Sequence, residues 1–208
     1  TGWPGGAVLG AFFVLSSVVS RLPARGRPAD LDPKGTRRDG WQVLANGGVA
    51  ALGACAERLE VGLGLWIVGS TLAAAAADTW ATSIGLWSGA APRDIIKGTP
   101  VSPGTSGGVT VLGSVGGVAG AVVVAGVGGA VSQRGALFLV ATIVGVTGML
   151  CDSLLGSLVQ GKFVCPACGT ATERRVHRCG ARTELERGRR WLDNDGVKDE
   201  LLTIALDM

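Results

Sequence analysis

Residues 107–131 read GGVTVLGSVGGVAGAVVVAGVGGAV, a run of small and apolar residues without one charged side chain. A helix needs roughly 20 apolar residues to cross the hydrocarbon core of a bilayer, so this run predicts a transmembrane helix. A second run, over residues 135–160, has Asp152 as its single charged residue. Neither run shows the polar face with a 3.6-residue period that a soluble helix needs. Together they indicate an integral membrane protein.

The composition of the whole chain supports this interpretation. Of its 208 residues, 47% are hydrophobic and only 17% are charged, and the mean hydropathy is +0.40. Soluble domains average about 25% charged residues. The net charge of +3 does not favour nucleic-acid binding, because the basic residues flank apolar segments and are placed to meet anionic lipid head groups. We predict an all-α fold, a polytopic transmembrane helix bundle.

Five full spans and the start of a sixth are expected. The predicted spans are residues 3–20, 41–56, 61–85, 107–131 and 135–160, followed by a segment that opens near Leu201. The expected division is a transmembrane bundle over 1–160 with loops 21–40 and 86–106, a Cys/His loop over 161–200, and a truncated span over 201–208. Because Thr1 is not an initiator Met and Met208 falls inside an apolar run, we expect a fragment or a processed form.

Lys and Arg residues are distributed unequally between the two predicted sides. Seventeen of the 19 lie in the two loops and in the segment after residue 160, and only Arg58 and Arg134 lie on the other side. Short loops on the cytoplasmic side of a membrane carry an excess of Lys and Arg. The chain is therefore expected to be a multi-pass protein of the cell membrane whose long loops are cytoplasmic.

Small residues recur at four-residue spacing in two of the predicted helices. The third has Gly69, Ala73, Ala77, Ala81 and Gly85, and the fourth has Gly113, Gly117, Ala121, Ala125 and Gly129. Small residues spaced in this way let helix backbones approach closely in lipid. We interpret both stripes as packing surfaces with no chemical role.

Two carboxylates lie near the predicted cytoplasmic ends of spans. Asp78 belongs to the third span and Asp152 to the fifth. A carboxylate inside a span is costly and usually faces the bundle interior or a wet cavity. Two acids on the same side favour one shared polar site that holds Mg²⁺, which prefers oxygen ligands and bound phosphate. The alternative is that both are helix-end acids solvated among lipid head groups.

The loop between the third and fourth spans contains a candidate anion site. Residues 97–108 read KGTPVSPGTSGG, with Gly104, Thr105, Gly107 and Gly108 in a turn expected to open the fourth span. Backbone N–H groups at such a helix start bind anions, and Lys97 would add a positive charge. Arg38 could clamp a phosphate from the first basic loop. The alternatives are an ordinary Pro/Gly turn and basic residues that only flank a span.

A candidate zinc site follows the fifth span. Cys165, Cys168, His177 and Cys179 form a Cys-x2-Cys-x8-His-x-Cys pattern that contains the only His in the chain. Four such ligands suit a closed, tetrahedral, structural zinc site. A cytoplasmic loop is reducing, so free thiols are the alternative and structural disulfides are not expected. Further along, Asn194 and Asp195 either add oxygen ligands to the phosphate site or cap the last helix.

Six short motifs resemble the integral membrane family catalogued as domain of unknown function 92. They are RRD (37–39), QVLANGG (42–48), ADTWA (77–81), PGTSGG (103–108), DSLLG (152–156) and LDND (192–195), in family order. The family includes the phytyl-phosphate kinase of plant vitamin E synthesis and the animal transmembrane protein 19, and the Cys/His insert resembles that of some bacterial members. The chain departs from the family pattern at Ser83, commonly Glu, and at Lys198, commonly Asn.

The resemblance to one branch of this family implies a nucleotide-dependent kinase. The expected reaction transfers the γ-phosphate of CTP or a similar nucleotide to an isoprenoid alcohol or isoprenyl monophosphate at the cytoplasmic interface. In that reading Asp78, Asp152, Lys97 and Arg38 are catalytic, and structural zinc supports the loop. The alternatives are a transporter of a small polar solute and a membrane scaffold whose zinc module binds a partner.

Overall fold

The computed structural model describes residues 1–22, 40–169, 171–172, 175–177 and 179–188. The chain divides into two compact units. The first unit holds residues 1–92 and 109–151, and the second holds residues 93–108 together with the chain from Asp152 onwards. The predicted segments Arg38, Asn194–Asp195 and the run from Leu201 lie outside the described residues.

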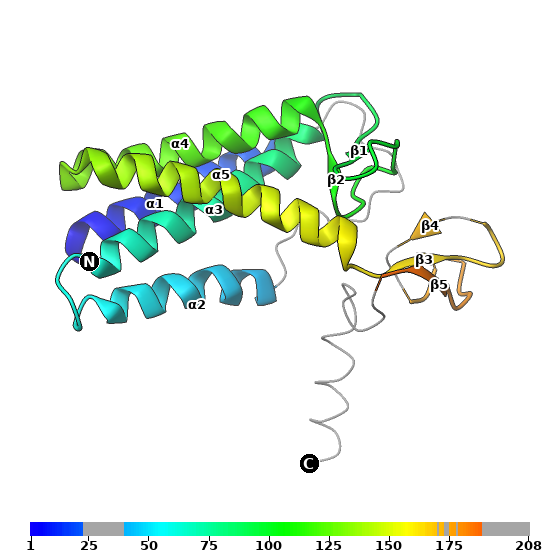
Figure 1. The fold of residues 1–208 in the computed structure, drawn as a ribbon, viewed down its shortest axis with the longest axis horizontal. Coiled ribbons are helices and arrows are strands. Elements are labelled where there is room, and N and C mark those ends of the chain that lie inside the picture. The colour runs from blue at the N-terminus through cyan, green and yellow to red at the C-terminus, as the bar shows by residue number, and fades with distance from the viewer. Residues whose placement is uncertain (23–39, 170, 173–174, 178, 189–208) are drawn as a thin grey trace, which may run out of the picture. The chain divides into compact units, whose positions relative to one another are not determined.

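The first unit is a bundle of long helices, so the all-α, membrane-type fold class is confirmed (Figure 1). The helices are α1 (Gly2–Arg21), α2 (Gly40–Ala56), α3 (Leu63–Gly85), α4 (Val111–Ser132) and the greater part of α5 (Gly135–Leu158). Helix α3 packs against α1, α2 and α4. It is therefore the central element of the bundle.

Three of the described helices, α1, α4 and α5, are long and apolar enough to cross a membrane. Helix α3 has 23 residues but is not among them, and α2 contributes a shorter apolar stretch, Gly47–Ala56. Asp78 and the neighbouring Thr79 and Trp80 lower the hydropathy of α3 towards its end. A helix that is surrounded by other helices can be less apolar than one that faces lipid.

The interface between α3 and α4 is built from small residues, as the stripes predicted. All five residues of the α4 stripe are buried. A Cβ atom placed on Gly113 would lie 2.7 Å from the carbonyl oxygen of Ala81, and one placed on Gly117 would lie 2.9 Å from that of Ala77. The two backbones are thus in direct contact, which brings dispersion and weak C–H···O contacts into play.

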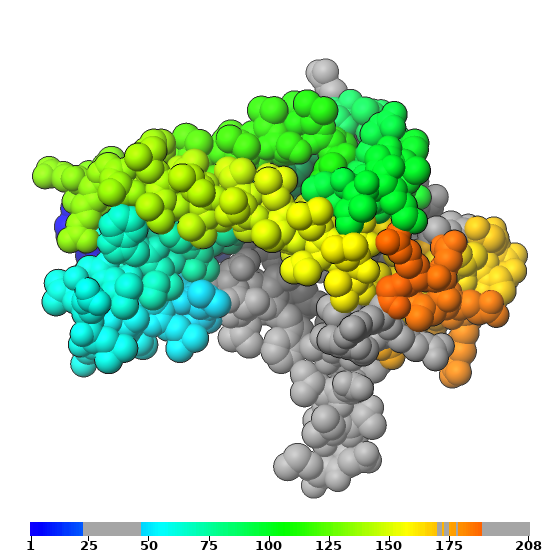
Figure 2. Space-filling view, in the orientation of Figure 1, coloured from blue at the N-terminus to red at the C-terminus, as the bar shows by residue number. Residues whose placement is uncertain are grey.

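Many large apolar side chains of the bundle lie on its outside, although others, such as Leu72 and Leu137, form its core. Phe13 is 69% exposed, Leu52 71% and Ile143 62%. In the space-filling view the atoms of α4 and α5 form a continuous outer surface along the bundle (Figure 2). In water such a surface would be an aggregation hazard, whereas lipid chains solvate it without cost.

Short strands, which the sequence did not predict, shape the second unit. Strand β1 (Arg93–Asp94) pairs with β2 (Gly108–Val109), and β3 (Lys162–Val164) lies between β4 (Ala171–Thr172) and β5 (Glu184–Arg187), antiparallel to both. Because Gly108 belongs to β2, α4 begins at Val111 and not at Gly107 as expected. Thr110 caps it, its side chain accepting a hydrogen bond from the Gly113 N–H at 3.0 Å.

Candidate functional site

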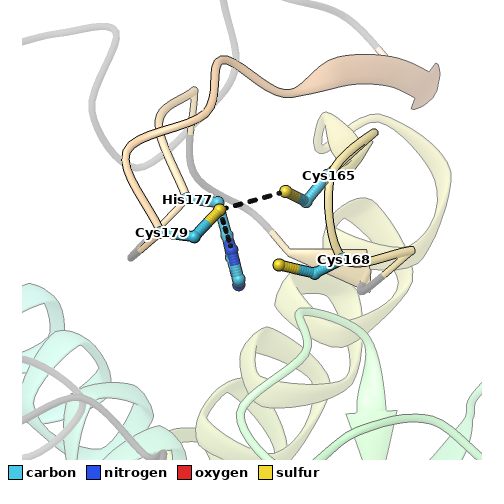
Figure 3. A group of neighbouring side chains, drawn as sticks. All are labelled: Cys165, Cys168, His177 and Cys179. Atoms are coloured by element: carbon cyan, nitrogen blue, oxygen red, sulfur yellow. Dashed lines mark hydrogen bonds between the residues drawn. The ribbon is translucent and has the colours of Figure 1, made fainter.

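The four predicted metal ligands come together in the second unit. The ligand atoms of Cys165, Cys168, His177 and Cys179 all lie within 4.8 Å of one another. The Sγ atoms of Cys165 and Cys179 are 3.5 Å apart, and Nδ1 of His177 is 3.1 Å from Sγ of Cys179. Figure 3 shows the three thiols pointing towards one another beside the imidazole ring. This cluster could hold a metal ion.

Two tight turns present these ligands. In the first, which follows β3 directly, the Gly169 N–H donates to the Cys165 carbonyl at 2.8 Å, and Gly169 has a φ of +65°. In the second, the Gly180 N–H donates to the His177 carbonyl at 2.9 Å, and Gly180 has a φ of +85°. Glycine adopts positive φ without the steric cost that other residues bear. The close His-x-Cys spacing is therefore explained by one turn that carries both ligands.

The donor set and its size fit zinc. Zn–S bonds of about 2.3 Å and Zn–N bonds of about 2.0–2.1 Å in a tetrahedron place neighbouring ligand atoms about 3.5–3.8 Å apart. The Cys165–Cys179 separation of 3.5 Å lies in that range, and all four ligand atoms are near enough for small movements to close the site around one ion. None of the five cysteines, all of which lie among the described residues, forms a disulfide, and Cys165 is fully buried. Three thiols and one imidazole therefore converge without a disulfide, as a structural zinc site requires.

The thiols of the cluster differ in acidity. A hydrogen bond to His177, helped by one from the Ala181 backbone, lowers the pKa of Cys179 to about 6. A hydrogen bond to Cys179, together with burial, raises the pKa of Cys168 to about 11. Neighbouring thiols cannot all ionise at neutral pH unless a cation compensates their charge. A bound divalent metal supplies that charge and takes the thiolate form of each ligand.

A second polar cluster in this unit is centred on Asp94, which is only 3% exposed. Its Oδ1 accepts hydrogen bonds from the backbone N–H groups of Ile96 and Lys97, each at 3.0 Å. The hydroxyl of Ser157, at the end of α5, donates to both carboxylate oxygens, and the Lys162 ammonium lies 3.3 Å from Oδ2. Burial alone would raise the pKa of Asp94, but these partners outweigh it and hold the pKa well below its usual range.

Two of the resemblance motifs meet here. A Cβ atom placed on Gly156, in DSLLG, would lie 3.0 Å from the Gly107 backbone nitrogen and 3.2 Å from Cβ of Ser106, both in PGTSGG. One placed on Gly107 would lie 2.5 Å from Cβ of Ser157. The Gly-rich loop is thus pressed against the last turn of α5. Its glycines serve close packing as well as turn geometry.

The other predicted site residues are placed as follows. Lys97 has an exposed side chain on this loop, and Asp152 is exposed on α5 one turn before Gly156. Residues four apart lie on the same face of a helix, so Asp152 shares the face of α5 that meets the loop. Asp78 is exposed on α3, in the other unit. Gly104 and Thr105 belong to the loop, where the Thr105 N–H donates to the Ser102 carbonyl at 3.1 Å.

Sequence reasoning missed Asp94, Ser157 and Lys162. A weak signal for Asp94 was available, because it precedes Gly98 by four residues and an Asp side chain in a turn accepts a hydrogen bond from the N–H two residues on. No local pattern joins Asp94 to Ser157, which lies 63 residues further along the chain.

Comparisons with known proteins agree on a membrane family. The family described as "Integral membrane protein DUF92" matches residues 1–202. An uncharacterized membrane protein of Methanocaldococcus jannaschii is 33% identical over 154 residues, which cover 74% of this chain and 64% of that protein. Protein PGR of Arabidopsis thaliana is 28% identical over 221 residues, which cover 92% of this chain and 75% of that protein. No solved structure matches the chain.

Proposed function

This chain belongs to the integral membrane protein family DUF92, and on that premise we propose that it is a membrane-bound phosphotransferase. The proposed reaction moves the terminal phosphoryl group of a nucleoside triphosphate, CTP by preference, to an isoprenoid alcohol or isoprenyl monophosphate. A P–O bond forms to the acceptor oxygen, the P–O bond to the nucleoside diphosphate breaks, and an acceptor hydroxyl releases its proton to water.

One observation carries this proposal: the Gly-rich loop packs against the turn of α5 that follows Asp152. The contact between Gly107 and Gly156 lies in the same small unit as the Asp152 carboxylate, the exposed ammonium group of Lys97 and the glycine-rich turn. Phosphoryl transfer asks for positioning and charge neutralisation more than for covalent chemistry. A carboxylate that holds Mg²⁺ and a cation beside backbone N–H groups meet that need.

The residues would divide the work by their chemistry. Asp152 would hold Mg²⁺ on the phosphates, Lys97 would compensate charge on the transferred group, and Gly104 to Gly108 would cradle phosphate oxygens. Arg38 would be a further clamp on the phosphates, and Asn194 and Asp195 would add oxygen ligands to the same site. Asp78 lies in the helical unit. Its predicted role as a second Mg²⁺ ligand is to be tested by the activity of Asp78→Asn. Structural zinc at the Cys/His cluster would hold the module after α5 together.

The bundle also offers room for an apolar acceptor tail. A groove of about 460 Å³ lies between α3 and α5, lined by Trp66, Ser70 and Ala74 on the former and by Val144 and Gly148 on the latter. Pockets of this size hold small ligands, and apolar lining suits an isoprenoid chain. An acceptor dissolved in the bilayer would explain why the enzyme is an integral membrane protein.

The test is nucleotide consumption by the purified chain in lipid nanodiscs. We expect turnover of CTP or ATP with a short isoprenoid alcohol or monophosphate, and a loss of at least about 100-fold in Asp152→Asn, since removing a charge-stabilising group typically costs that much. The matched control is Glu60→Gln, which removes an exposed carboxylate from the loop between α2 and α3, outside the proposed site. This variant should keep full activity.

Two results would overturn the proposal. One is full activity in Asp152→Asn. The other is a protein that consumes no nucleotide with any acceptor; solute uptake by liposomes containing that protein would then favour a transporter that uses Asp78 and Asp152.

Ser83→Glu is informative as well, because it restores the acidic residue common in the family. If that acid is a metal ligand, the variant should be faster than the wild type.

A further inference from the structure

The three-residue strand β3 directly joins the two polar clusters of the second unit. Lys162, at its start, makes the ion pair with Asp94, and Cys165, the first candidate metal ligand, follows its last residue. Between them Phe163 is only 1% exposed. Lys162 pairs with Arg187 and Phe163 pairs with Leu185 on β5, with a register irregularity between them. The position of Cys165 and the pairing with β5 together therefore restrict where Lys162 can reach.

The sheet around β3 is too small to hold this position unaided. Its strands have three, two and four residues. Short hairpins and very small sheets are marginal in water unless a metal, a disulfide or a larger core supports them. Cys165 and Cys168 lie on the β3–β4 connection, and His177 and Cys179 lie between β4 and β5. A metal bound to all four therefore fastens both connections of the sheet and fixes β3 in its centre.

At the other end of the ion pair, Asp94 fixes the shape of the loop. Its carboxylate accepts the Ile96 and Lys97 N–H groups, its carbonyl accepts the Gly98 N–H at 2.8 Å, and its own N–H donates to Thr99 at 2.9 Å. Next to it, the Ile95 N–H donates to the Gly107 carbonyl at 2.9 Å. The turn that carries Lys97 thus depends on where this one carboxylate is held.

We propose that metal binding at the Cys/His cluster is transmitted through β3 and the Lys162–Asp94 ion pair to the loop over residues 93–108. Asp94 is then a positioning residue: it converts a folded metal module into a fixed Lys97 turn and a fixed Gly-rich segment. The proposal does not depend on which reaction the protein catalyses, because the coupling is a property of the second unit alone.

Hydrogen–deuterium exchange on the whole chain in detergent micelles tests the coupling directly. The readout is the exchange rate of peptides that cover residues 93–99, where the Ile96 and Lys97 amides bond to Asp94. Removing zinc with a chelator should raise that rate by about tenfold, the change expected when a hydrogen bond to a charged group is lost. Peptides from α4 should be unaffected, which shows that the bundle stays folded.

Two variants separate the proposed path from general loosening. Lys162→Met keeps the apolar stem and removes the ammonium group, so residues 93–99 should exchange about tenfold faster with zinc still bound. Chelation should then add little. Arg182→Met removes an exposed positive charge from the same module and should behave like the wild type.

Either of two outcomes would overturn the proposal. If chelation deprotects the Gly169 and Gly180 amides of the metal module but leaves residues 93–99 as protected as before, the two clusters are not coupled. If Lys162→Met retains the wild-type protection of residues 93–99, the ion pair does not carry the coupling.

Discussion

The hydroxyl of Ser157 donates to both carboxylate oxygens of Asp94, at 2.8 and 2.9 Å, although the two residues are 63 positions apart. This bond ties the last turn of α5 to the loop over residues 93–108, within the second unit. Both residues are almost completely buried. A carboxylate kept charged in such a place depends on every partner it has.

The first prediction concerns acid. The pKa of Asp94 is lower in the folded chain than in the unfolded one, so its contribution to stability is complete above the unfolded value of about 3.9 and is lost as the pH falls through the folded value. Exchange protection of residues 93–99 should be constant from about pH 5 to 7 and decline below about pH 4. Asp94→Asn should be less protected at neutral pH and lack this acid-dependent decline. A wild type that keeps its full neutral-pH protection at about pH 2, or an Asp94→Asn variant as protected as the wild type at neutral pH, would show that the Asp94 charge does not hold this loop.

The second prediction concerns metal content. The chain purified without chelators should contain one equivalent of zinc, and Cys168→Ser should contain much less, because a site with three ligands left loses much of the roughly 10–16 kcal/mol that such sites contribute. Elemental analysis gives the zinc content, and Co²⁺ substitution gives a thiolate absorption band. Cys151→Ser removes an exposed thiol of α5 that lies outside the cluster, so it should keep its zinc. Equal zinc in both variants would show that the metal sits elsewhere.

The third prediction concerns the α3–α4 interface. In Gly117→Ala the new Cβ would lie 2.9 Å from the Ala77 carbonyl and 3.1 Å from Cβ of Ala81, and would also collide with the sulfur of Met149. Overpacking of this kind costs about 1–3 kcal/mol, so heat denaturation in detergent should occur at a lower temperature. The matched control is Gly126→Ala on the same helix, where nothing lies within 4 Å of the new methyl group. That variant should be neutral or more stable, since Ala favours a helix over Gly.

The fourth prediction concerns orientation. If the basic loops are cytoplasmic, a membrane-impermeant thiol reagent added to intact cells should label Gln133→Cys, in the α4–α5 turn, and not Ser102→Cys. Both positions are exposed, so accessibility within the protein does not decide the result. Permeabilised cells should label both. Labelling of Ser102→Cys alone in intact cells would reverse the predicted topology.

The helices could be predicted because their signal is local. The length of an apolar run such as 107–131 is enough to predict a membrane-spanning helix. The four-residue spacing of small residues from Gly113 to Gly129 predicts which face of that helix packs against a neighbour. The Cys/His cluster could also be predicted from the sequence, because the only His lies within ten residues of two cysteines and zinc ligands commonly occur at such short spacings in the chain. Each of these inferences needed one continuous stretch of sequence.

What escaped prediction depends on contacts between distant segments. Helix α4 starts only at Val111 because Gly108 belongs to β2 and Gly107 packs against Ser157. No property of the loop itself reveals these contacts. Strands of two to four residues carry too little pattern to be recognised, because turn hydrogen bonds and ligand positions determine them more than side-chain preference does. The Asp94 cluster is hidden for the same reason, since each partner alone is an ordinary loop or helix-end residue.

The glycine-to-carbonyl contacts between α3 and α4 reverse the usual relation between the size of a residue and its tolerance of substitution. In a soluble protein, large core side chains tolerate few substitutions, whereas small surface residues tolerate many. Here Phe13, Leu52 and Ile143 face outwards, so any residue that dissolves in hydrocarbon could replace them over time. Gly113 and Gly117 are far less tolerant, because even a single methyl group meets the neighbouring backbone. Genetic variation in this part of the chain should therefore accumulate at large outward-facing positions and be purged from the glycines of the α3–α4 interface.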